Sequence, residues 1–145
     1  MYPSLWEQPQ TLLGATLRAV LRATGRVRGE AREGGRCFVE APGVAVSLGA
    51  YVFWFEGPTR WTFGDAWTRR HEAGHAVQSA FLGPLYLPLV GVPSALRALY
   101  AVGYRELTGR RWRRYFDGYP EAWADRLGRV DRARAMASWP EDGRP

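Results

Sequence analysis

The sequence contains no lysine, isoleucine or asparagine, only two histidines, and a single cysteine, Cys37. One cysteine excludes an intramolecular disulfide and favours a reducing compartment. The start, MYPSLWEQPQ, lacks the basic and apolar regions of a secretory signal, so we expect a cytoplasmic protein. A GC-rich genome can produce the bias toward arginine, alanine, glycine and proline, so this bias carries no functional information.

What the sequence does contain is typical of a globular protein. The chain has 145 residues, of which 46% are hydrophobic and 14% aromatic, which is enough apolar surface to offset the entropy of ordering. We expect one domain over residues 1–145, with a frayed tail at about 139–145. All 20 basic residues are arginine and the net charge is +6, which favours acidic partners such as phosphate or an anionic membrane surface.

The first third of the chain predicts a helix followed by a small sheet. Apolar residues at helical spacing predict an amphipathic helix over about 11–24. The glycine-rich segment 25–36 favours a solvated loop or a twisted ribbon. A strand at 37–41, a turn at Pro42-Gly43 and a longer strand at 44–55 then predict a short antiparallel sheet. The fold class expected is therefore α+β.

Two helices that carry the acidic and histidine motifs are predicted in the rest of the chain. Thr62 and Asp65 have the spacing of a capping box, so we expect a helix to begin there and to end at about Leu82, before Gly83-Pro84. A second helix, PEAWADRLG, should begin with Pro120 at its first position.

The uncharged segment 80–96, AFLGPLYLPLVGVPSAL, lies between these helices. Its length is marginal for a membrane span, which needs about 20 apolar residues, and its three prolines argue against one straight helix. We expect a buried irregular wall or a segment that dips into a membrane, with a helix resuming after Pro93-Ser94.

Both histidines lie in the sequence HEAGH. On a helix each residue turns about 100°, so His71 and His75 lie on one face and can converge on a single ion. Imidazole nitrogens are zinc ligands, and a catalytic zinc site keeps three protein ligands and one open position. Glu72 is placed to accept a proton from a zinc-activated water without binding the metal. The pattern predicts a zinc site with its own general base.

The third ligand is sought among downstream carboxylates, because no third histidine exists. Glu121 and Asp125 are spaced i, i+4 and therefore share a helical face. Glu121 could bind zinc while Asp125 accepts a hydrogen bond from a ligand imidazole. The alternative is structural: Glu121 would favour the first turn of its helix through the helix dipole, and Asp125 would pair with Arg126 or Arg129.

These motifs resemble those of known zinc metallopeptidases over about residues 62–128. HExxH followed by ExxxD resembles the gluzincin branch, HEAGHAV is similar to the FtsH protease motif, and PEAWAD is similar to a segment of HtpX-type peptidases. The stretch HEAGHAVQSAFLGPLYLPLVGVPS resembles small bacterial zincin-like proteins with HExGHxxQS, GPxYL and GxPS.

This resemblance implies a minimal zincin-like core and peptide-bond hydrolysis. It implies His71, His75 and Glu121 as ligands of one zinc per chain, Glu72 as general base, and Asp125 as a partner of a ligand. It further implies a strand, within 44–55, whose edge pairs with an extended peptide or protein substrate.

Many such enzymes stabilise the oxyanion with a histidine, tyrosine or arginine. Tyr119, two residues before Glu121, is the candidate that we assign to this role, and Tyr115 is a second one. Either tyrosine could instead serve only in packing.

Three other functions stay open. A zinc site without catalysis would need a fourth ligand, for which Asp117 and Asp131 are available. Peripheral membrane contact through the arginine-bearing helix 11–24 and segment 80–96 is compatible with peptidase activity. A nucleic-acid-binding module would use Arg110–Arg114, but no nucleic-acid fold signature accompanies this cluster, which disfavours it.

Overall fold

The computed structural model describes residues 5–59 and 63–137 and has a mixed α+β fold. The helices are α1 (Gln8–Ala23), α2 (Ala66–Leu82), α3 (Val92–Thr108), α4 (Glu121–Gly128) and α5 (Arg132–Ala137). Short helical turns are η1 (Leu5–Glu7), η2 (Gly83–Leu85), the π-helical η3 (Leu87–Gly91) and η4 (Arg113–Phe116). Strands β1 (Gly29–Glu33), β2 (Arg36–Glu40), β3 (Val46–Leu48) and β4 (Tyr51–Trp54) form one sheet, and β5 (Gly57–Pro58) pairs with β6 (Phe63–Gly64).

The main sheet is mixed, and the expectation of an antiparallel sheet is wrong in this respect. Its order is β1-β2-β4-β3, and β2 pairs with β4 in parallel. The chain does turn at Pro42-Gly43, but the long strand expected at 44–55 reverses at Gly49. Gly49 has a φ of +57°, and a Cβ there would lie 2.2 Å from Oγ1 of Thr11 on α1. The close approach of α1 therefore requires glycine at this reversal.

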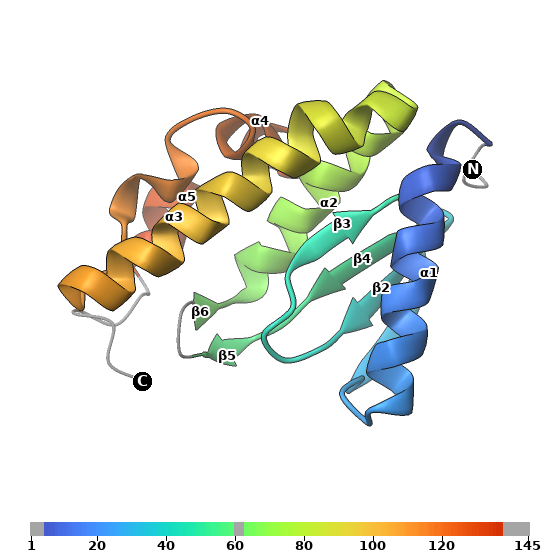
Figure 1. Ribbon diagram of the computed structural model, residues 1–145, viewed down its shortest axis with the longest axis horizontal. Helices are drawn as coiled ribbons and strands as arrows, with labels where there is room; N and C mark the ends of the chain where they lie inside the picture. The colour runs from blue at the N-terminus through green and yellow to red at the C-terminus, as the bar shows by residue number, and fades with distance from the viewer. Residues whose placement is uncertain (1–4, 60–62, 138–145) are drawn as a thin grey trace.

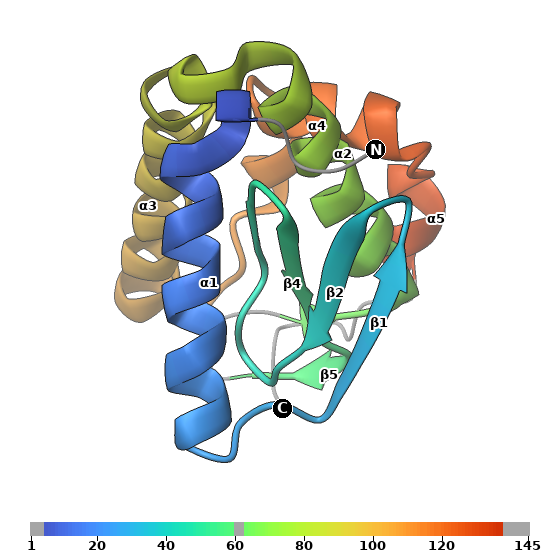
Figure 2. The same cartoon turned by 90° about the vertical axis from the view of Figure 1, so that its right-hand side faces the viewer.

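Helices cover both faces of the sheet (Figure 2). Side chains alternate along β2 and β4, so that Val39 and Phe53 pack with Leu21 of α1, whereas Phe38 and Val52 pack with Ala76 of α2. The predicted helix at 11–24 is confirmed as α1, which begins three residues earlier. Of the two structures considered for the glycine-rich segment 25–36, the ribbon is the one observed, because β1 pairs antiparallel with β2.

Helix α2 begins later than predicted. Asp65 is its N-cap, accepting hydrogen bonds from the backbone N–H groups of Trp67 and Thr68, and the Thr68 hydroxyl accepts from the Asp65 N–H. The capping box is thus Asp65 with Thr68, three residues beyond the expected start, while Thr62 lies outside the described residues. An aspartate carboxylate caps as well as a threonine hydroxyl, and the sequence pattern alone did not distinguish the two boxes.

Helix α4 packs on α2, and α3 runs across the outside of the molecule (Figure 1). Segment 80–96 is helical rather than an irregular wall, because η2, η3 and the start of α3 follow α2 almost without interruption. Only Gly83, Tyr86 and Val90 of this segment are buried. In the part of the chain that the structure describes, no helix combines the length and apolar character that a bilayer crossing requires. The tail predicted to fray, 139–145, falls outside the described residues.

Candidate metal centre

Helix α2 carries both histidines of the chain on its buried face. His71 and His75 are one turn apart, their ring centroids are 4.7 Å apart, and each side chain is almost completely buried. Burial of two imidazoles is costly unless their nitrogens have partners, so the partners of these rings define what the site can do.

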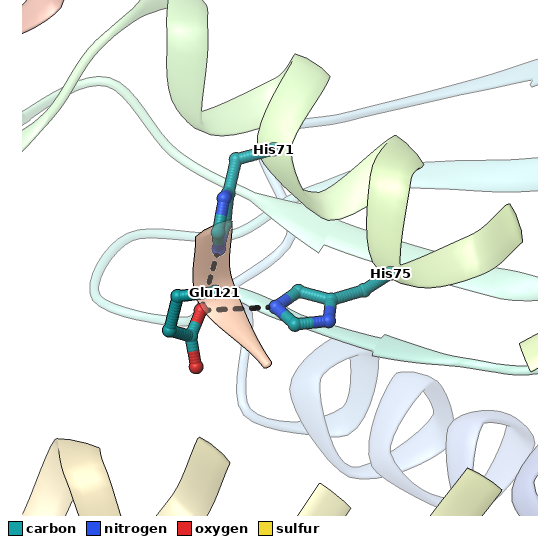
Figure 3. Close-up of side chains that lie close together, drawn as sticks. All are labelled: His71, His75 and Glu121. Carbon is teal, nitrogen blue, oxygen red and sulfur yellow. Dashed lines mark hydrogen bonds and ion pairs between the residues drawn. The ribbon is translucent and has the colours of Figure 1, made fainter. Parts of the chain in front are cut away.

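Helix α4 brings Glu121 to the two imidazoles (Figure 3). Its Oε2 atom lies 2.9 Å from Nε2 of His71 and 3.1 Å from Nε2 of His75. Together they offer three ligand atoms within 4.8 Å of one another, all from buried residues. The three residues predicted as ligands are therefore brought together, although they are separated by up to 50 positions in the sequence.

Two glycines allow α2 and α4 to approach this closely. A Cβ on Gly74 would lie 2.0 Å from the carbonyl oxygen of Ala124, and a Cβ on Gly128 would lie 2.1 Å from the carbonyl oxygen of Arg70. Real side chains do not tolerate such distances to backbone atoms, so any larger residue would force the helices apart. Gly74 lies inside HEAGH, where a small residue already indicates that a neighbour can approach closely, whereas no sequence pattern indicates this role for Gly128.

The second nitrogen of each imidazole is held by a hydrogen-bond acceptor. Nδ1 of His71 donates to Asp125 at 2.7 Å, as the spacing of Glu121 and Asp125 predicted. Nδ1 of His75 donates to the side-chain oxygen of Gln78, also at 2.7 Å. With Nδ1 protonated, a neutral imidazole presents the lone pair of Nε2, which is the atom that points at Glu121.

Further contacts hold the acceptors themselves. Arg132 donates to Asp125 at 2.8 Å. The arginine paired with Asp125 is therefore neither Arg126 nor Arg129, which were the partners considered from the sequence. Gln78 donates to the carbonyl of Pro120 at 3.2 Å, and Ser94 on α3 donates to Oε1 of Glu121 at 2.6 Å. Gln78 and Ser94 belong to the quoted motifs HExGHxxQS and GxPS, but the sequence assigned no role to either residue. Arg132 lies outside these motifs and comes from a distant segment.

The electrostatics follow from burial and from this network. Burial by itself lowers the pKa of His71, but the hydrogen bonds to Asp125 and Glu121 outweigh it and raise that pKa to about 9. Burial by itself raises the pKa of the Glu121 and Asp125 carboxyls, but hydrogen bonds outweigh it and lower both pKa values. Glu121 is hydrogen-bonded to His71 and His75, and Asp125 is hydrogen-bonded to His71 and Arg132. Without a metal, the site thus favours an imidazolium between two carboxylates.

Glu72, the predicted general base, is buried beside the histidines. Its Oε2 atom is inaccessible and has no hydrogen-bond partner among the described residues. Burial raises the pKa of Glu72, against the opposing effect of the two histidines. A carboxylate in this environment binds a proton more readily than an exposed one, which suits a group that accepts a proton during a reaction.

The tyrosines differ in their distance from the centre. Tyr119 is half-exposed, and its hydroxyl donates to the carbonyl of Leu89 at 2.5 Å, so the structure does not bring this candidate to the three ligands. The Tyr115 side chain lies close to Ser94, the serine that donates a hydrogen bond to Glu121. Burial raises the pKa of the Tyr115 hydroxyl, which keeps it protonated.

The strand expected to receive a substrate, within 44–55, is divided between β3 and β4. Strand β3 lies at the edge of the sheet, next to α2. The hydroxyl of Tyr86 already donates to the carbonyl of Ser47 in this strand at 3.1 Å. Pairing of a substrate backbone with β3 remains a prediction.

The donor set suits zinc. Two imidazole nitrogens and one carboxylate oxygen are the ligands of a common type of catalytic zinc site. Asp117 and Asp131, considered as additional ligands, are both exposed and lie outside the group of three. The centre therefore offers three protein ligands, with a buried and unpartnered carboxylate oxygen of Glu72 nearby.

Comparisons with known protein families, with curated proteins and with solved structures found no match for this chain.

Proposed function

We propose that the protein is a zinc-dependent peptidase of gluzincin type, with His71, His75 and Glu121 as zinc ligands. The observation that carries the proposal is the convergence of these three side chains beside the buried, unpartnered oxygen of Glu72. Zinc bound there would lower the pKa of a water to about 7 and polarise a peptide carbonyl.

Glu72 is the general base in this mechanism. Its carboxylate accepts a proton from the attacking water and later returns this proton to the amine that leaves. The raised pKa of Glu72 suits both steps, because the protonated form is not strongly disfavoured.

The other polar residues fix the ligands in place. Asp125 and Gln78 orient the two imidazoles through Nδ1, and Ser94 holds the second oxygen of Glu121. Such contacts reduce the rearrangement needed when the ligands bind an ion. The oxyanion role predicted for Tyr119 would require its hydroxyl to leave the Leu89 carbonyl, whereas Tyr115 lies close to Ser94, which contacts Glu121.

The test is the variant Glu72→Gln, which removes the base and keeps the shape of the side chain. We expect hydrolysis of a quenched fluorescent peptide library to fall at least about a hundredfold, while zinc stays bound at one ion per chain. The matched control is Glu56→Gln, because Glu56 is exposed on the surface. Hydrolysis that survives in Glu72→Gln would overturn the assignment of the base.

A non-catalytic zinc site is the alternative. Structural zinc usually has four protein ligands, whereas the described residues provide three, which favours catalysis. A zinc-loaded parent protein that cleaves no peptide in the library would contradict the peptidase proposal and support the alternative.

A further inference from the structure

Helix α3 and the turns before it expose an apolar stripe. None of the residues of α3 is buried. Five apolar residues lie at intervals of three or four residues along these segments, and each is between 46% and 68% exposed. We call them the α3 stripe: Leu85, Leu89, Val92, Leu96 and Leu99. Figure 1 shows α3 as a long outer helix, away from the sheet. Exposed apolar residues at this spacing mark a contact surface rather than scattered surface side chains.

The surroundings of the α3 stripe are positively charged. No acidic residue occurs between Glu72 and Glu106 in the sequence. After α3, the exposed arginines Arg110, Arg113 and Arg114 follow within a few residues. They stay close to the helix, because Arg97 on α3 donates to the backbone carbonyls of Arg114, at 2.7 Å, and of Tyr115, at 3.0 Å. An apolar ridge thus borders a basic cluster.

Two aromatic side chains lie where the ridge meets the basic cluster. Tyr100 of α3 is 57% exposed, and its ring packs edge-on against Trp112 with a centroid distance of 4.6 Å. Tyrosine and tryptophan prefer the boundary between lipid headgroups and acyl chains, because one end of each side chain is polar and the rest is apolar.

We propose that the α3 stripe docks this protein on the surface of an anionic phospholipid membrane, with Arg110, Arg113 and Arg114 contacting the headgroups. The stripe would lie in the interface parallel to the membrane plane, as amphipathic helices with a basic region do. The positive charge beside the stripe favours lipid over a second copy of the chain as its partner. A second copy would bring the same excess of positive charge to the contact, whereas anionic lipid neutralises it.

Helix α1 is a less suitable membrane contact than the sequence suggested. It exposes Leu12 and Leu13, but both of its arginines already form ion pairs with one acidic side chain. Arg18 and Arg22 both pair with Glu30 on β1, at 2.7 and 2.8 Å. The exposed leucines of α1 therefore provide a matched control for those of α3, because the arginines of α1 are engaged by Glu30.

The test is co-sedimentation of the full chain with vesicles of phosphatidylcholine alone and of phosphatidylcholine with phosphatidylserine. We expect the parent protein to bind the vesicles with phosphatidylserine and to bind much less to the others. The variant with Leu96→Ser and Leu99→Ser should lose about tenfold or more in partition coefficient, because its apolar contact is removed. Arg113→Ala with Arg114→Ala should lose about tenfold or more through the lost headgroup attraction.

The control variant carries Leu12→Ser and Leu13→Ser on α1 and should bind as the parent does. All these positions are exposed, and circular dichroism would verify that each variant is folded. Equal binding by the parent and the α3 leucine variant would overturn the proposal. So would a dimer, detected by light scattering without any vesicle binding, that dissociates in the α3 leucine variant, because it would assign the stripe to a second copy. Neither result depends on peptidase activity.

Discussion

Helix α2 and helix α3 have the same length, 17 residues, but opposite distributions of polar and apolar side chains. The buried residues of α2 are mostly polar or small: His71, Glu72, Gly74, His75, Ala76, Gln78 and Ser79. Helix α3 buries none of its residues and exposes leucines. Folding alone favours the reverse arrangement, with apolar residues inside and charged residues outside.

We interpret each departure from that rule as the sign of a contact with something other than the chain itself. In the polar interior of α2, hydrogen bonds to α4 hold His71 and His75, whereas Glu72 keeps one buried oxygen without a partner among the described residues. This interior has the composition of a metal site. The apolar exterior of α3 lacks a partner among the described residues and has the composition of a docking surface. Where local rules fail, a functional site is the expected reason.

The largest effect should come from separating α2 and α4. Gly74→Ala places a Cβ against the backbone carbonyl of Ala124, 2.0 Å away, which neither helix can avoid without moving. We expect a loss of about 3 kcal/mol or more in the free energy of unfolding, with much weaker zinc binding. Urea denaturation and isothermal titration with zinc would measure both. An unchanged midpoint and zinc affinity would show that the helices do not pack as described.

The stability of the metal-free protein should depend on pH over a defined range. The pKa of His71 is raised from 6.5 to about 9, so its protonated form stabilises the metal-free fold. This contribution, of the order of a few kcal/mol, is complete below pH 6.5 and is lost as the pH rises through about 9. Thermal melts of chelator-treated protein should show the loss, and the variant His71→Gln should lack it. A parallel loss in both proteins would contradict this origin.

Removal of the hydrogen-bond acceptor of His71 should have a moderate effect on zinc affinity. Asp125→Asn weakens the acceptor for Nδ1 of His71 and also the pair with Arg132. We expect zinc affinity to fall about tenfold to a hundredfold. Competition with a fluorescent zinc chelator would measure it. Asp117→Asn is the control, because Asp117 is exposed and outside the cluster, and an equal effect of the two variants would count against the hydrogen bond.

The smallest expected effect is an increase in the stability of the fold. Gly103 lies in the middle of α3, and a Cβ there would have no atom within 4 Å. Gly103→Ala should therefore stabilise the protein by about 0.5 to 1 kcal/mol through the lower entropy of the unfolded chain. The opposite signs expected for Gly74→Ala and Gly103→Ala sharpen the contrast between the two helices. Destabilisation by Gly103→Ala in urea would mean that α3 is packed more tightly than its exposure indicates.

Local patterns were enough to predict α1, α2 and α4 and to select the three residues that the structure brings together, His71, His75 and Glu121, with their neighbour Asp125. These predictions rest on helical periodicity for α1, on start and stop signals for α2 and α4, and on i, i+4 spacing for the candidate ligands, all of which need only a few adjacent turns. Even the limit of α2 at Leu82 agrees with the Gly83-Pro84 signal.

The sheet order and the exposure of α3 could not be obtained in the same way. Whether β2 pairs with β4 in parallel depends on where β3 is placed, and no short pattern contains that information. Segment 80–96 contains prolines, yet they lie close to helix starts, so the segment continues as helix. Ser94 and Arg132 reach the metal centre only through tertiary packing.

The most direct test of the account is the zinc content of the protein purified without added metal, measured by elemental analysis beside His71→Ala. We expect about one zinc per chain in the parent, since one cluster offers three ligands, and almost none in the variant. No zinc in either protein, even after reconstitution, would contradict the metal centre and with it the proposed peptidase.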